Sequence, residues 1–148
     1  MTLELYNWNL RKNKFNHSGY RYPSSKWDGQ VRRAVHRAGL RYLTQRGIAW
    51  GTRARGVTPL VATPDLYFEK YRLAVFLDGC YWHGCQICQP TKNQDRYERD
   101  RHVDAALERD GYRLLRIWEH VGAEVAAEQV IERVAQLRAE RPSSGRGG

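Results

Sequence analysis

The sequence has 148 residues and a formal net charge of +9, from 25 Lys and Arg residues against 16 Asp and Glu. This length suits one domain with a hydrophobic core, and the interleaved apolar residues exclude wholesale disorder. No apolar run reaches membrane-spanning length and no signal-peptide pattern is present, so we expect a cytoplasmic protein without membrane contact. The basic excess favours nucleic acid as the partner.

The N-terminal half predicts one helix, one strand and two irregular segments. Residues 1–24 are basic and aromatic without periodicity, and they predict an arm that lies on DNA or a tail on the domain surface. An apolar face at helical spacing predicts a helix at 26–38, which Gly39 ends. We expect a short strand at 40–45, and then an exposed loop at 46–63, rich in Gly, Arg and Thr, that contacts phosphates.

The C-terminal half alternates strands with helices. Strands are predicted at 65–68 and 72–78, and the second is a continuous apolar run typical of a strand buried on both faces. A Cys-rich loop at 79–92 follows. The remaining elements are predicted as a helix at 94–110, a strand at 112–118 and a helix at 122–139. This order predicts an α/β fold with a mixed sheet flanked by helices, in one domain at 25–140, and a disordered tail at 141–148.

The three cysteines of the chain lie in nine residues, as Cys80, Cys85 and Cys88. This clustering favours a structural metal site in a reducing compartment over a disulfide scaffold. Tetrahedral zinc needs a fourth ligand, and His120 and His83 are both candidates. The alternative is three small, buried, free cysteines.

Two aspartates lie at the ends of the predicted hairpin, Asp65 at its start and Asp78 at its close. The turn places both near one end of the sheet, where two carboxylates suit a hard divalent cation such as Mg²⁺. The alternative is two solvated aspartates. His83 in the adjacent loop is a candidate for proton transfer from water, or else a loop histidine without function. Tyr81 and Trp82 are candidates for stacking on DNA bases, or for a lid over the core.

A longer stretch of the sequence resembles a known family. The run Val75-Phe76-Leu77-Asp78-Gly79-Cys80-Tyr81-Trp82-His83-Gly84-Cys85, with Pro64-Asp65 before it, resembles the signature of very short patch repair (Vsr) DNA mismatch endonucleases. Segments at 32–42, 99–115 and 117–120 agree with the family in order and spacing. The resemblance covers residues 25–121.

The resemblance implies a restriction-endonuclease-like fold of the PD-(D/E)XK superfamily, with an αβββαβ core. It implies a Mg²⁺-dependent enzyme with a structural Zn²⁺ that nicks duplex DNA 5′ to the thymine of a T·G mismatch. The implied partners are double-stranded DNA and mismatch-repair proteins. We expect a monomer in the bacterial cytoplasm, associated with the nucleoid.

Matching positions carry the family's roles onto this chain. Asp65 matches the essential metal-binding aspartate, and His83 matches the histidine implicated in water activation. Asp28 falls where the family has an acidic residue near the metal; the alternative is a capping-box partner of Ser25. Asp100 matches a supporting acid, or else pairs with an arginine. The remaining matches are the zinc ligands Cys80, Cys85, Cys88 and His120 and the intercalating aromatics Tyr81 and Trp82.

The segment between Cys88 and Arg99 is shorter than is usual in the family and lacks its tryptophan. This difference favours one alternative, a restriction- or defence-type endonuclease of the same fold with another substrate. A second alternative is a zinc-braced module that binds DNA without cutting it.

Overall fold

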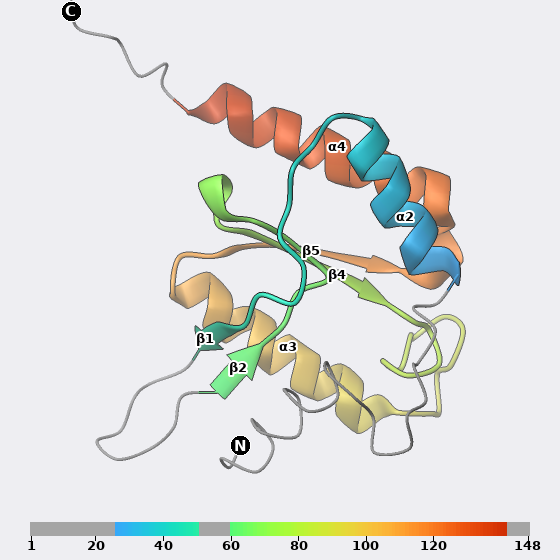
Figure 1. The fold of residues 1–148 in the computed structure, drawn as a ribbon. Helices are drawn as coiled ribbons and strands as arrows, with labels where there is room; N and C mark the ends of the chain where they lie inside the picture. The colour runs from blue at the N-terminus through green and yellow to red at the C-terminus, as the bar shows by residue number, and fades with distance from the viewer. Residues whose placement is uncertain (1–25, 51–59, 142–148) are drawn as a thin grey trace, which may run out of the picture.

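A three-stranded mixed sheet lies between two layers of helices (Figure 1). The computed structural model describes residues 26–50 and 60–141, so the expected arm at 1–24, Ser25 and all but the first residue of the expected tail lie outside the described residues. The described elements are α2 (Lys26–Arg37), β1 (Ile48–Trp50), β2 (Leu60–Ala62), β3 (Leu66–Phe68), the 3-10 turn η1 (Glu69–Tyr71), β4 (Leu73–Asp78), α3 (Gln94–Arg109), β5 (Arg113–Trp118), the 3-10 turn η2 (Glu119–Val121) and α4 (Ala123–Glu140).

The central strand β4 joins an antiparallel and a parallel neighbour. It pairs antiparallel with β3, through the hairpin turn η1, and parallel with β5, so that Asp78 lies opposite Trp118. All six residues of β4 are buried, which confirms the prediction of a strand covered on both faces. Because β4 and β5 are parallel, the segments that leave them start at the same edge of the sheet.

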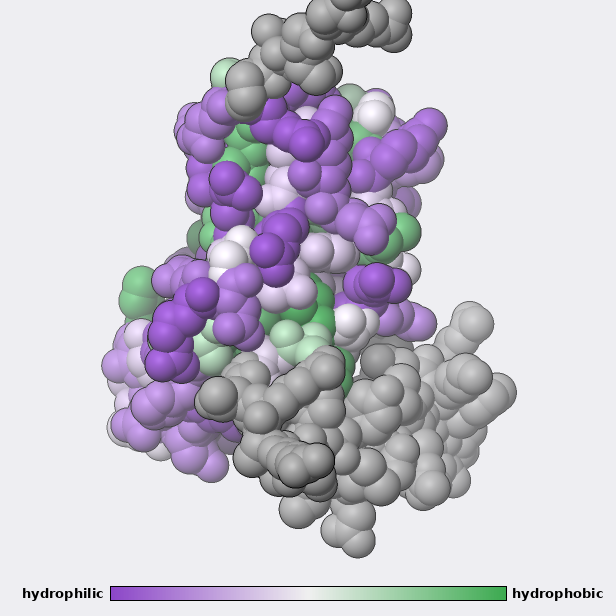
Figure 2. Space-filling view, turned by 90° about the vertical axis from the view of Figure 1, so that its left-hand side faces the viewer, coloured by the Kyte–Doolittle hydropathy of each residue, from purple (hydrophilic) through white to green (hydrophobic). Residues whose placement is uncertain are grey.

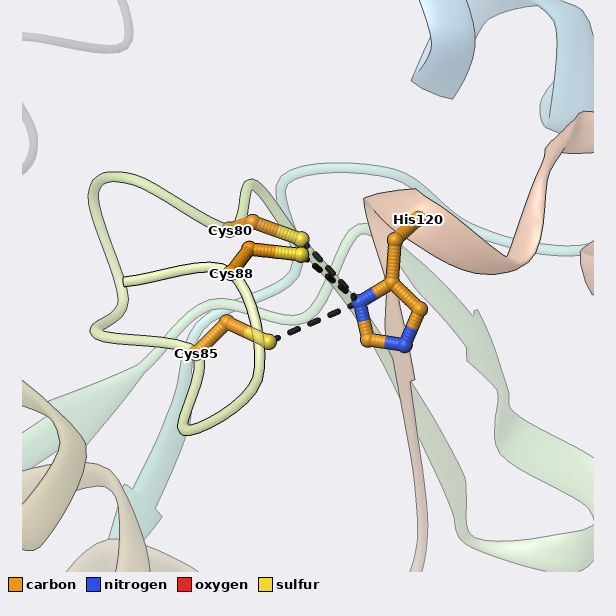
Figure 3. A group of neighbouring side chains, drawn as sticks. All are labelled: Cys80, Cys85, Cys88 and His120. Atoms are coloured by element: carbon orange, nitrogen blue, oxygen red, sulfur yellow. Dashed lines mark hydrogen bonds between the residues drawn. The ribbon is translucent and has the colours of Figure 1, made fainter. Parts of the chain in front are cut away.

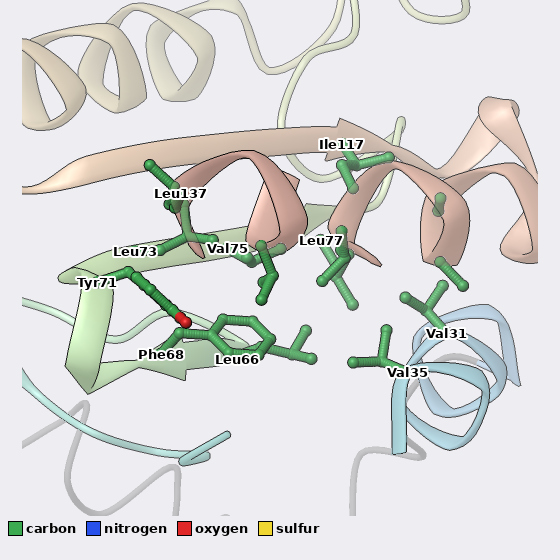
Figure 4. Close-up of a cluster of buried hydrophobic side chains, with 14 of the residues drawn as sticks. Val31, Val35, Leu66, Phe68, Tyr71, Leu73, Val75, Leu77, Ile117 and Leu137 are labelled. Atoms are coloured by element: carbon green, nitrogen blue, oxygen red, sulfur yellow. The ribbon is translucent and has the colours of Figure 1, made fainter. Parts of the chain in front are cut away.

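Alternate residues of β4 pack into two separate cores. Leu73, Val75 and Leu77 belong to the larger cluster, with α2 and α4, and Figure 4 shows Leu77 on the side of Val31 and Val35 of α2. The residues between them, Ala74 and Phe76, pack with Val103 and Leu107 of α3 on the other face. By the same alternation Asp78 is directed toward α3, where the candidate site lies.

The strand expected at 40–45 is wrong. Only Leu43 pairs with the sheet, through two backbone hydrogen bonds of 2.8 Å with Tyr67. Gln45 then adopts a positive φ of 56°, which ends the extended conformation. Side chains hold the segment in place instead, since the Tyr42 hydroxyl donates to the Arg32 carbonyl oxygen at 3.0 Å.

The uninterrupted loop expected at 46–63 is also wrong, because it contains β1 and β2, an antiparallel pair. Ile48 and Ala62 are buried in the core under α3, and this burial outweighs the turn-like composition of the segment. Gly47 permits the close approach of the two strands, since a Cβ there would lie 2.9 Å from Val61 Cγ1. Residues 51–59 lie outside the described part, and with them most of the expected phosphate contacts.

The surface seen in Figure 2 is mostly hydrophilic, with apolar residues in small separate patches. No helix within residues 26–50 and 60–141 combines the length and the apolar character that crossing a bilayer requires. The large exposed hydrophobic side chains of the described residues include three on the loop after β4, namely Tyr81, Trp82 and Ile87.

Candidate active site and metal centre

Three cysteines and one histidine converge at the edge where β4 and β5 end (Figure 3). The Nδ1 atom of His120, in η2, lies 3.3 Å from the sulfur of Cys80 and 3.5 Å from those of Cys85 and Cys88. All three thiols are free, without a disulfide. His120 therefore takes the fourth position for which His83 was the other candidate.

The geometry of this cluster fits a tetrahedral metal ion. Zinc bonds of about 2.3 Å to sulfur and about 2.0 Å to nitrogen, at tetrahedral angles, separate S and N by about 3.5 Å. Burial raises the pKa of the Cys80 thiol to about 12, so without a cation the cluster disfavours multiple thiolates. A bound cation with affinity for sulfur would fit these S–N distances and would stabilise the thiolates.

The loop between the cysteines is fixed from the start of α3. Gly84 has a positive φ of 67°, and a Cβ there would lie 2.3 Å from the Asn93 carbonyl oxygen, so only glycine fits. The Asn93 side-chain amide donates to the Tyr81 carbonyl oxygen at 2.6 Å, and that of Gln94 donates to the Gly84 carbonyl oxygen at 3.2 Å. These contacts set the positions of the residues between Cys80 and Cys85.

His83 lies in this loop and points to two carboxylates. Its Nδ1 is 2.8 Å from Asp100 Oδ2, on α3, and 3.6 Å from Asp78 Oδ1, at the end of β4. Burial alone raises the pKa of Asp100, but the hydrogen bond with His83 and the Arg116 charge outweigh it, and the pKa lies below its usual value. Asp100 is thus ionised and suited to accept a hydrogen bond from an Nδ1–H group of His83. In that tautomer the Nε2 atom of His83 keeps its lone pair.

An arginine that the sequence analysis did not single out links Asp78 to Asp104. Arg116, on β5, donates through Nη1 to both oxygens of Asp78, at 3.0 and 2.8 Å, and through Nε and Nη2 to Asp104 of α3, at 2.7 to 3.1 Å. The signal in the sequence was a charged residue inside an apolar strand, which needs a buried partner. The solvated alternative for Asp78 is wrong, since this side chain is 2% exposed.

Asp65 lies at the same end of the sheet, one residue before β3. Its backbone N–H donates to the Val75 carbonyl oxygen at 2.9 Å, and its Oδ2 accepts the Leu77 N–H at 2.7 Å. Burial, with smaller contributions from the charges of Asp28 and Asp78, raises the pKa of Asp65 from 3.8 to about 6, although the Leu77 hydrogen bond and the Arg32 charge lower it. A carboxylate held in this way gains stability from a nearby cation.

The predicted acidic residues thus form one neighbourhood but not one tight cluster. Among the described residues, the groups whose ligand atoms all lie within 4.8 Å are the Cys–His cluster and the group of Asp78, His83 and Asp100. Asp65 belongs to neither. Asp28 forms an ion pair with Arg32 along α2, and its alternative role with Ser25 falls outside the described residues.

Tyr81 and Trp82 project from the anchored loop. Their side chains are 45% and 69% exposed, and their rings make an edge-to-face contact with centroids 4.9 Å apart. Exposure of this degree is contrary to a lid over the core and leaves both rings accessible to a base.

Comparison with known proteins places this geometry in a family. The family model described as DNA mismatch endonuclease Vsr matches residues 9–89, and so extends before residue 25, where the resemblance of the motifs begins. The type II nicking enzyme V.NaeI of Lentzea aerocolonigenes is 32% identical over 79% of this chain and 73% of its own length.

Two further relatives match a shorter part of the chain. The type II nicking enzyme V.XorIIP of Xanthomonas oryzae is 32% identical over 60% of this chain and 65% of its own length. The DNA mismatch endonuclease Vsr of Escherichia coli is 28% identical over 52% of this chain and 54% of its own length. Since the family match spans more than half of the sequence, the chain belongs to the Vsr family of DNA endonucleases.

Proposed function

We propose that this protein is a Mg²⁺-dependent endonuclease that nicks one strand of duplex DNA at T·G mismatches. The observation that carries the proposal is the pair of His83 and Asp100, 2.8 Å apart, at the end of the sheet where Asp65 accepts the Leu77 N–H. The loop that carries His83 also exposes Tyr81 and Trp82. These residues combine proton transfer, cation binding and base stacking at one edge of the sheet.

Asp65 is the proposed principal ligand of the magnesium ion. Burial and the charges of Asp28 and Asp78 raise its pKa to about 6, so a cation bound beside this carboxylate would favour its ionised form. Asp78 and Asp28 add negative charge to the same region, although both oxygens of Asp78 already accept hydrogen bonds from Arg116. When bound, the cation stabilises charge on the scissile phosphate and lowers the pKa of water.

His83 is the proposed proton acceptor. With Nδ1–H donated to Asp100, the ring is held in the tautomer whose Nε2 accepts a proton from the attacking water. The ionised Asp100 also stabilises the imidazolium that forms. This arrangement supplies the proton chemistry without a lysine after Asp78.

The Cys–His cluster is proposed to bind zinc in a purely structural role, since its four ligands leave no position for substrate. Its effect is to hold Tyr81 and Trp82 outward and His83 inward. Aromatic residues exposed on a rigid loop can stack on or between bases, and a mismatched step is the easiest to open.

The test is a nicking assay on otherwise identical T·G and matched duplexes, with Mg²⁺ and with EDTA. We expect product from the T·G duplex only, in Mg²⁺ only, cut in the thymine strand. Asp65→Ala should lower the rate about 10³-fold or more, because losing the cation removes several kcal/mol of transition-state stabilisation. Asp95→Ala, at an exposed acid in the first turn of α3, is the matched control.

A second substrate class is favoured by the names of the relatives, two of which are type II nicking enzymes. In that case the enzyme acts beside a restriction system, and adding hemimethylated and fully methylated duplexes to the assay detects it. Equal nicking of matched and T·G duplexes would exclude mismatch specificity, but it would still support the proposed endonuclease activity. The non-catalytic module is disfavoured because both His83 and Asp65 are in place.

A further inference from the structure

Arg116 occupies a position that is unusual for a charged residue. It lies within β5, its side chain is 10% exposed, and its Cζ atom lies 4.3 Å from the centroid of the Phe76 ring. Burying a guanidinium costs free energy unless all of its charge and donors are matched. Burial alone lowers the pKa of Arg116, but Asp104 and Asp78 together raise it above its usual value, so the residue is charged.

The two edges of the guanidinium have different partners. The edge with Nε and Nη2 is anchored on Asp104, and Nη1 meets both oxygens of Asp78 at 3.0 and 2.8 Å. The same Nη1 is 3.9 Å from Asp100 Oδ2, beyond hydrogen-bond distance. Arg116 therefore neutralises Asp78 and leaves Asp100 without a direct hydrogen bond from it.

This asymmetry decides which acid His83 uses. A neutral imidazole has one N–H, and two carboxylates face Nδ1, Asp100 at 2.8 Å and Asp78 at 3.6 Å. If Asp78 were unpaired, it would compete for that N–H and turn the ring. Because Arg116 donates to both Asp78 oxygens and neutralises their charge, Asp78 is the weaker acceptor, the N–H remains on Asp100 and Nε2 keeps one direction.

We propose that Arg116 is a positioning residue of the active site, which selects Asp100 as the partner of His83 by occupying Asp78. This proposal rests on the proposed function only for the role of His83 in cleavage. The positioning itself is a property of the free protein, and it can be measured without DNA.

The experiment compares zinc-loaded wild type with Arg116→Met and Arg116→Lys. The first readout is the NMR signal of the His83 Nδ1–H, assigned by its absence in His83→Gln. The second is the single-turnover nicking rate at saturating duplex and Mg²⁺, together with DNA affinity. Arg113→Met is the matched control, because Arg113 lies on the same strand and donates to the Tyr71 carbonyl oxygen at 3.0 Å, at the opposite end of the sheet.

In Arg116→Met we expect the His83 signal to move or broaden and the nicking rate to fall about 10- to 100-fold with unchanged DNA affinity, as for a displaced catalytic group. Arg116→Lys should recover part of both, because an ammonium neutralises Asp78 but cannot bridge it to Asp104. Arg113→Met should match wild type. A folded, zinc-loaded Arg116→Met protein with the wild-type His83 signal would overturn the proposal.

If Arg116→Met loses its fold, Arg116→Gln carries the test, since its side chain has no charge and cannot donate to both Asp78 oxygens as Arg116 does. An unmoved His83 signal in a folded Arg116→Gln protein also overturns the proposal. Failure of the wild type to cut any duplex would instead reject the proposed function, whatever the His83 signal shows.

Discussion

Two clusters on the same loop differ in how they are built. The Cys–His cluster takes three of its four candidate ligands from nine consecutive residues and only His120 from elsewhere. The cluster around His83 takes Asp78 from β4, His83 from the loop, Asp100 and Asp104 from α3, and Arg116 from β5. The first depends on a short loop closing on itself, whereas the second depends on the register of a sheet and the docking of a helix.

The loop from Cys80 to Cys85 therefore contributes both to the Cys–His cluster, through its cysteines, and to the cluster around His83. His83 is three residues from Cys80 and two from Cys85, so a fixed loop can aim its imidazole at carboxylates held independently by the sheet. In the proposed function, coordination of a metal ion by the cysteines replaces the longer packing contacts that a loop histidine otherwise needs. Perturbing one cluster at a time should show whether this division holds.

Removing zinc should have the largest effect. Treatment with a strong chelator should lower the melting temperature by about 10 °C or more and abolish nicking, because thiolate binding contributes directly to folding. Reloading with Zn²⁺ should restore both properties, and Mg²⁺ alone should restore neither. A chelated protein that retains its melting temperature would show that the sulfurs hold no structural ion.

His83→Ala should break the second cluster while the first survives. We expect the nicking rate to fall about 10²- to 10³-fold, the usual contribution of a positioned general base, with zinc content and DNA affinity unchanged. His102→Ala, at an exposed histidine of α3, should leave the rate as in wild type. Equal rates in the two variants would remove His83 from the mechanism.

Trp82→Ala should affect recognition more than chemistry. Stacking of one base on an aromatic ring contributes about 1–3 kcal/mol, so affinity for the T·G duplex should fall about 10-fold or more at an unchanged single-turnover rate. Ile87→Ala is the control, since Ile87 is equally prominent on the loop at 77% exposure but has no ring. Binding isotherms at one fixed salt concentration give the comparison.

Asp65→Asn should have the smallest effect, a gain in stability without Mg²⁺. Since folding raises the pKa of Asp65 from 3.8 to about 6, the folded state holds a proton that the unfolded state releases in this window. Wild type therefore loses stability as the pH rises from about 4 to about 6, and the loss persists above. The variant should be more stable by about 3 kcal/mol at neutral pH and equal to wild type well below pH 4.

Denaturant titrations at several pH values measure this difference in the free energy of unfolding. Adding Mg²⁺ should stabilise wild type and not the variant. A difference that does not change with pH would exclude Asp65 as its source.

Much of the fold was predictable because periodicity and glycines mark it directly. The apolar run at 73–77 predicted a buried central strand, and Gly39 and Gly111 marked the ends of two helices, each with a positive φ. The errors at 40–45 and 46–63 arose where side chains rather than composition decide the backbone, as with Tyr42 and Ile48.

The candidate site divides in the same way. The cysteines were visible as a cluster in the sequence, and the Vsr signature indicated His83 and Asp65. Arg116 was not predictable, because its two partners lie 38 and 12 residues away and meet it only through strand register and helix packing. Residues brought together by tertiary structure leave only an indirect trace in the sequence, here a cation in an apolar strand.

The hydrogen bond from the Leu77 amide to Asp65 gives the protein an internal reporter. Backbone amides in a sheet usually donate to carbonyl oxygens, whose charge does not titrate, but this amide donates to a carboxylate at 2.7 Å. Its nitrogen chemical shift and its rate of exchange with deuterated solvent should therefore follow the electronic state of that carboxylate. Occupancy by a divalent ion could be read from a single backbone resonance, before any DNA is added.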